Sequence, residues 1–142
     1  MAEETHIYDF GNYETVSEEL AEIFYCLKKM ASDFDFSENE PIASLVEKQT
    51  AVCGYASRMK ASFSEFLKRA YHTDPDHVAE GSYAGKIAGV LNEMKRKTFY
   101  FEKIALQLPA DKIKTNLREA ARLANSLPAM VAALDAGEDE VR

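Results

Sequence analysis

Four stretches of the chain repeat apolar residues at alternating spacings of three and four, and this period limits what the chain can fold into. An α-helix turns once in about 3.6 residues, so the spacing places the apolar side chains of each stretch on one helical stripe. No stretch shows the sustained alternation of a half-buried strand. The pattern predicts an all-α protein, an antiparallel four-helix bundle. The stripes run from Val16 to Phe34, Leu45 to Ala70, Ala84 to Leu108 and Ile113 to Leu134.

Capping residues and prolines separate the stretches. Ser37 and Glu40 have the spacing of a capping box, and Pro41 after them can occupy a first helical turn. Asp74 precedes Pro75 as an N-cap precedes a proline at the first helical position. These short breaks favour consecutive helices that run in opposite directions.

The fourth stretch contains Pro128, which we expect to kink the last helix or to restart it after Ser126. Aromatic residues before the first stretch suggest an N-terminal arm that packs on the bundle. We therefore predict an arm over residues 1–13, the bundle over 14–136 and a frayed acidic tail over 137–142.

Charge and composition narrow the classes of partner. Residues 1–47 carry twelve acidic and two basic side chains, a net charge of −10, whereas residues 48–136 have a net charge of +5. The overall charge of −7 disfavours general binding to nucleic acid or to anionic membranes, and the acidic portion suggests a basic protein partner. With no transmembrane run or signal peptide, and with Cys26 and Cys53 expected to be reduced, we expect a cytoplasmic protein.

Two polar clusters resemble metal sites. The segment YHTDPDH, residues 71–77, contains two histidines and two aspartates, but helix capping accounts for the aspartates, and no Glu-x-x-His supplies a bundle-type site. Glu18, Glu19 and Glu22 form E-E-x-x-E, which is similar to half of the magnesium motif of MazG-type nucleotide pyrophosphohydrolases. The E-x-x-D that this family carries on the next helix is missing. We predict no metal or cofactor, and keep a magnesium-dependent nucleotide hydrolase as an alternative.

Three of the six glycines, Gly81, Gly85 and Gly89, are spaced four residues apart in a segment expected to be helical. Each glycine in a helix interior costs about 1 kcal/mol relative to alanine, so the series suggests a close approach by another group. That group is a side chain such as Phe63 or Phe66, a second copy of the chain, or a flat ligand covered by Tyr83 or Tyr55. Mere tolerance of the glycines is the remaining interpretation.

The segment TFYFEK adds exposed aromatic surface. On a helix, Phe99, Tyr100 and Phe101 point in directions about 100° apart, so only Phe101 belongs to the apolar stripe. Phe99 and Tyr100 then need cover from the arm or from a partner. The sequence favours a non-catalytic, self-associating interaction or regulatory bundle, a dimer above other oligomers. Its candidate interface or ligand-binding residues are Gly81, Gly85, Gly89, Tyr83, Phe99 and Tyr100, and the alternative is a small-ligand-binding bundle.

Overall fold

The computed structural model describes residues 17–100 and 102–137, and among these residues there are helices and connections but no strand. Four long helical units pack against each other, as the apolar period predicts. Their bounds are α1 Glu18–Met30, α2 Ile42–Tyr71, α3 Tyr83–Thr98, and a last unit formed by α5 Ala110–Asn125 with α6 Leu127–Asp135. Shorter elements are the 3-10 helices η1 Ala31–Phe34 and η2 Pro75–His77, and helix α4 Glu102–Ala105. The predicted arm, Val16, Phe101 and residues 138–142 lie outside the described residues.

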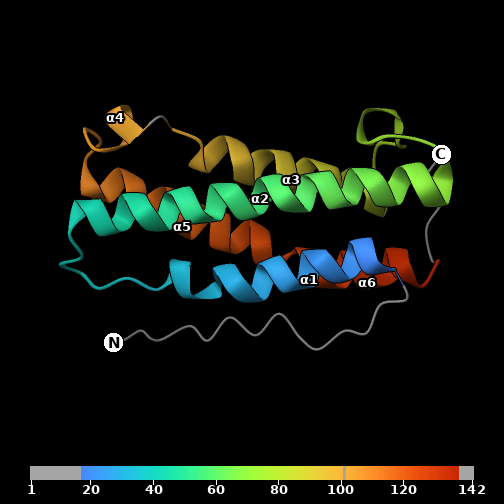
Figure 1. Cartoon of the computed structure of the whole chain (residues 1–142), viewed down its shortest axis with the longest axis horizontal. Helices are drawn as coiled ribbons and strands as arrows, with labels where there is room; N and C mark the ends of the chain where they lie inside the picture. The colour runs from blue at the N-terminus through green and yellow to red at the C-terminus, as the bar shows by residue number, and fades with distance from the viewer. Residues whose placement is uncertain (1–16, 101, 138–142) are drawn as a thin grey trace.

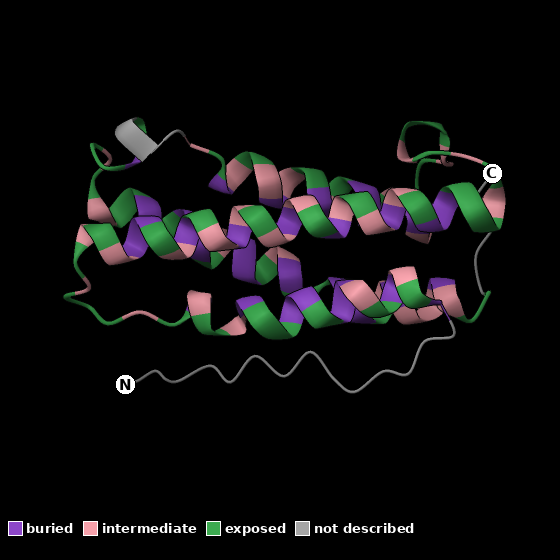
Figure 2. Ribbon diagram, viewed as in Figure 1, coloured by how far each residue is buried: buried purple, intermediate pink, exposed green. Residues whose placement is uncertain are grey.

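Consecutive long units run in opposite directions along an elongated molecule (Figure 1). Helix α1 packs on α2, α2 packs on α3, and α3 packs on both α5 and α6, while α6 also contacts α1. The apolar stripes meet in one continuous core, and Figure 2 shows the buried residues recurring along each long helix. The core is mainly leucine, isoleucine, methionine, phenylalanine and alanine.

Two side-chain amides are buried in this core. Asn116 of α5 donates a hydrogen bond from Nδ2 to Oε1 of Gln49 on α2 at 3.1 Å, and the two residues are 3% and 1% exposed. A buried polar group is costly unless it has a hydrogen-bonding partner, so this pair favours one alignment of α2 with α5. The apolar spacing identifies Gln49 as a polar position within a stripe, but it does not identify its partner.

The helix boundaries differ from the prediction at three places. Pro41 is the N-cap residue of α2 rather than part of its first turn, and Glu40 closes the preceding turn by accepting the Ser37 N–H at 3.0 Å. Asp74 is an N-cap, but of η2 rather than of a long helix. Helix α3 begins later, at Tyr83.

The end of α3 also differs from the prediction. The apolar stripe predicts one helix to Leu108, whereas α3 ends at Thr98 and the chain becomes extended at Phe99. Three successive aromatic residues could not all reach the core from one helix, because they would point about 100° apart. Leaving the helix lets Tyr100 pack partly against the core.

Pro128 acts as predicted at the last unit. It lies in the first turn of α6, after a break at Ser126, and the last unit bends by 28°. Proline is tolerated at this point because the first N–H groups of a helix have no intrahelical acceptor. No helix in the part of the chain that the structure describes is both long enough and apolar enough to cross a bilayer.

Candidate functional site: a groove and an exposed apolar patch on helix α3

The three glycines do not form one bare helical strip. Gly81 precedes α3 and has a φ of +88°, a conformation that favours glycine in a turn. A Cβ on Gly85 would lie 2.6 Å from the carbonyl oxygen of Ala79, whereas a Cβ on Gly89 would meet no described atom within 4 Å. The prediction that all three lie on one helical face is therefore wrong, because the helix starts only at Tyr83.

The aromatic residues of α2 do not explain the glycines either. At Gly85 the nearest groups are Ala79 and Ser82, from the turn that leads into α3. Ser82 caps the helix by accepting the Gly85 N–H at 3.0 Å, and its hydroxyl donates to the Ala79 carbonyl at 2.6 Å. Phe63 and Phe66 instead stack on each other, with ring centroids 6.4 Å apart. Close packing at Gly85 is thus local to the turn.

Gly89 lines an open groove between α3 and the bent last unit, which we call the α3/α6 groove. Its volume is about 450 Å³. The groove lies at the junction of α5 and α6. There, the absence of a side chain at Gly89 and the small side chain of Ser126 leave space between α3 and the last helical unit. Its lining residues are Lys86, Gly89, Val90, Leu123, Ser126 and Met130. Lys86 is the one charged residue among them, and its Nζ lies 5.7 Å from the centroid of the Tyr83 ring.

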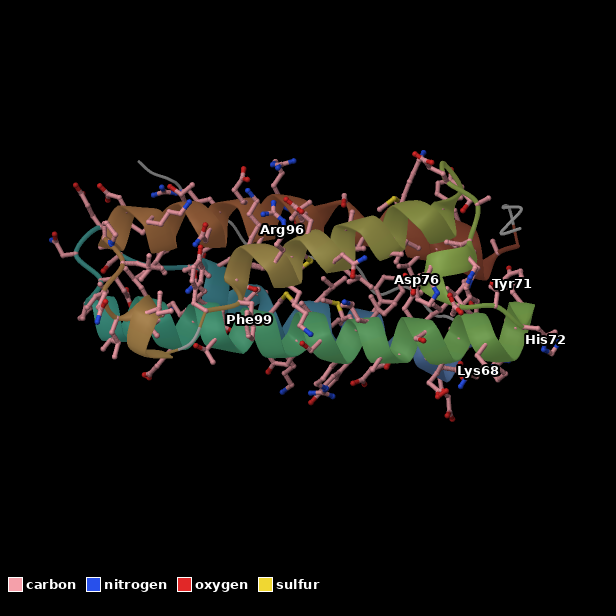
Figure 3. The ribbon with its side chains drawn as sticks, turned by 90° about the horizontal axis from the view of Figure 1, so that it is seen from above. Lys68, Tyr71, His72, Asp76, Arg96 and Phe99 are labelled. Carbon is pink, nitrogen blue, oxygen red and sulfur yellow. The ribbon has the colours of Figure 1, made fainter. Side chains whose placement is uncertain are left out.

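A second surface feature lies on the connection from α3 to α5. Phe99, Ile104 and Leu106 are 53%, 50% and 45% exposed, and we call these three residues the connection patch. Figure 3 places Phe99 at the C-terminal end of α3, far from His72 and Asp76 at the opposite end of the bundle. Contiguous exposed apolar surface is typical of interaction sites, which makes these three residues candidates for one.

The other two predicted aromatic residues are only partly available to a partner. Tyr83 and Tyr100 are half-buried, and both pack against the core. Of the six predicted site residues, the structure therefore places Gly89 in a groove and Phe99 on an exposed surface. Gly81 lies in the turn before α3, and Gly85 lies in the first turn of α3, close to the Ala79 carbonyl of that preceding turn. The apolar spacing missed Ile104, Leu106, Leu123 and Met130, because their exposure depends on the end of α3 and on the bend at Ser126.

Two carboxylates of the acidic triplet on α1 pair with arginines of α2. Glu19 accepts two hydrogen bonds from Arg69 at 2.9 Å, and this guanidinium together with the Ser17 hydroxyl lowers the pKa of Glu19 to about 2. Glu22 pairs with Arg58, whose guanidinium also lies over the Tyr25 ring. Two of the three carboxylates thus hold α1 against α2. Ion pairs of this exposed kind contribute about 0 to 1 kcal/mol each.

The histidine and aspartate segment forms a local turn. Asp74 accepts the Asp76 N–H at 2.9 Å and lies 2.8 Å from Nδ1 of His77. The hydrogen bond to His77 holds the pKa of Asp74 below its usual range. Within residues 17–100 and 102–137, no group of three histidine, cysteine or acidic side chains is arranged to hold a metal ion.

The cysteines differ in their surroundings. Cys26 is fully buried, and burial with the nearby Glu22 raises its thiol pKa to about 11, whereas Cys53 is half-buried. Both thiols are free. A high pKa keeps a thiol protonated at neutral pH, so burial and protonation both disfavour reaction of Cys26 in the folded protein.

Comparison with known proteins supplies no family for this arrangement. No protein-family model, curated protein or solved structure matches the chain.

Proposed function

We propose that the chain is a cytoplasmic, non-catalytic interaction bundle that self-associates through the connection patch, most simply as a dimer. One observation carries this proposal. Of the four exposed large apolar side chains in the described part of the chain, three lie between Phe99 and Leu106. Apolar residues scattered singly over a surface need no explanation, but a concentration in one short segment does.

A second copy of the chain is the partner that the surroundings of the patch favour. The α1–α2 connection, which is acidic, and helix α4 lie at the same end of the bundle (Figure 1). The last turn of α3, just before the patch, carries Lys95, Arg96 and Lys97. Two copies that meet at this end about a two-fold axis can pair opposite charges around an apolar centre, which is the usual arrangement of an interface.

The proposal is tested by sedimentation equilibrium on the full chain and on Phe99→Ser combined with Leu106→Ser. Truncating an apolar residue at the centre of an interface costs about 2 kcal/mol, so we expect the dimer dissociation constant to rise by about 30-fold or more. Tyr25→Ser is the matched control, because Tyr25 is 47% exposed but lies on α1.

Self-association at another surface would leave the double variant as dimeric as the control. That result, or a wild-type protein that stays monomeric throughout the concentration series, contradicts the proposal. Circular dichroism on each variant checks that the helices remain, and since all three positions are exposed we expect no loss of helix.

The alternatives have less support. A flat ligand between α2 and α3 would need the glycines as an open strip, and Gly85 is closed by the turn at Ala79. Magnesium-dependent hydrolysis would need several carboxylates around one ion, whereas Glu19 and Glu22 are paired with arginines of α2. A basic protein partner for the acidic part of the chain stays a prediction.

A further inference from the structure

The α3/α6 groove is lined by apolar side chains and by one basic residue. Val90, Leu123 and Met130 supply the apolar side chains, and Lys86 is the charge on the lining. On the α5 side, Arg122 directly precedes Leu123 and lies 3.5 Å from Glu119, a carboxylate that it shares with Lys97 at 3.1 Å. On the α3 side, Glu93 is paired with Arg96. A segment that fits this groove is apolar with acidic flanks.

The chain itself contains such a segment immediately before α1. Residues 1–16 have a net charge of −4, with no lysine or arginine. The acidic residues alternate with large apolar ones in this segment: Glu3, Glu4, Ile7, Tyr8, Asp9, Phe10, Tyr13 and Glu14. Its composition is therefore complementary to that of the groove in both charge and hydrophobicity.

The geometry also permits the contact. Residues 1–16 join the described chain at Ser17, the N-cap of α1. Helix α1 contacts α6, and α6 contributes Met130 to the groove. Packed helices lie about 8–10 Å apart, and an extended chain covers about 3.3 Å per residue. The seven residue-to-residue steps from Phe10 to Ser17 thus span about 23 Å, enough to cross one helix.

We propose that the α3/α6 groove binds residues 1–16 of the same chain, with the aromatic residues on the apolar floor and the carboxylates near Lys86 and Arg122. This contact is independent of the self-association proposed above. The connection patch lies beyond the C-terminal end of α3, whereas the groove lies along its first half.

Hydrogen exchange followed by mass spectrometry tests the proposal on the full chain, at a concentration where native mass spectrometry shows only monomer. We expect the amides of residues 3–13 to exchange about tenfold more slowly than in a free peptide of the same sequence. Gly89→Leu fills the groove, and we expect it to bring exchange in residues 3–13 close to the free-peptide rate.

Gly54→Leu is the matched control, because Gly54 is also an exposed glycine in a helix with open space around its Cβ position. Gly54→Leu should leave the protection of residues 3–13 unchanged. Lys86→Glu should reduce that protection, whereas its charge control Lys112→Glu should not. Free-peptide exchange in the wild type overturns the proposal. Equal protection of residues 3–13 in Gly89→Leu and in the wild type also overturns it. Protection that appears only once dimers form overturns it as well, because the groove would then bind residues of a second copy.

Discussion

The Gly85→Ala substitution distinguishes two explanations of this glycine: close packing requires it, or the helix merely tolerates it. Gly85 and Gly54 both lie inside helices, so replacing either with alanine should gain about 1 kcal/mol of helix propensity. Gly54 lies in the interior of α2 and Gly85 in the first turn of α3, and their surroundings also differ. No described atom lies within 4 Å of a Cβ on Gly54, whereas a Cβ on Gly85 would lie 2.6 Å from the Ala79 carbonyl oxygen.

The clash at Gly85 involves backbone and cannot be relieved by rotating a side chain. The turn at Ala79 must move, and this turn is held by the Ser82 hydroxyl and by the Ser82 N–H, which donates to the Ala79 carbonyl at 3.2 Å. Weakening the Ser82 cap costs about 1 kcal/mol, and overpacking costs a further 1 kcal/mol or so. We expect Gly85→Ala to be destabilised by about 1 kcal/mol and Gly54→Ala to be stabilised by up to about 1 kcal/mol.

Urea unfolding followed by circular dichroism at 222 nm measures this difference of about 2 kcal/mol, provided that the slope against urea is the same in both variants. The free energy of unfolding is compared with that of the wild type in one buffer. If Gly85→Ala proved as stable as Gly54→Ala, the turn at Ala79 would not be what requires glycine at position 85.

Three further predictions concern the core, the ion pairs and the thiols. Asn116→Leu leaves the buried Gln49 amide without its partner, so we expect a loss of about 1–3 kcal/mol in urea unfolding, and a double variant with Gln49→Leu should lose less than the two single changes together. The ion pair with Arg69 lowers the pKa of Glu19 to about 2, so the pair stabilises the fold fully above pH 4.5 and loses this effect as the pH falls towards 2. In Glu19→Gln, the free energy of unfolding should therefore depend less on pH in that range. A thiol reagent at pH 8 should modify Cys53 much faster than Cys26, which should react only as the protein unfolds.

Periodicity alone predicts most of the fold. The apolar stripes locate all four helical units, and Pro128 predicts the break in the last one, because both signals depend on local geometry. The end of α3 is not predicted, because Thr98, Phe101 and Ala105 continue the stripe in sequence, whereas the chain leaves the helix at Phe99. At this point, burying aromatic side chains favours an extended chain more than the apolar spacing favours a continued helix.

The surface features depend on long-range packing, and the sequence identifies them only in part. Regular spacing made the three glycines look equivalent, but a positive φ at Gly81 and the turn at Ala79 give them different roles. The groove arises from Gly89 opposite the bend at Ser126, residues far apart in the chain. Phe99 is the predicted residue whose exposure the structure confirms.

Native mass spectrometry of the wild-type chain, purified without added metal or nucleotide, tests self-association most directly. We expect a dimer with twice the 15.9 kDa mass of the chain, in an amount that rises with protein concentration and falls in Phe99→Ser. A single 15.9 kDa species at all concentrations tested would contradict the proposal that the connection patch joins two copies.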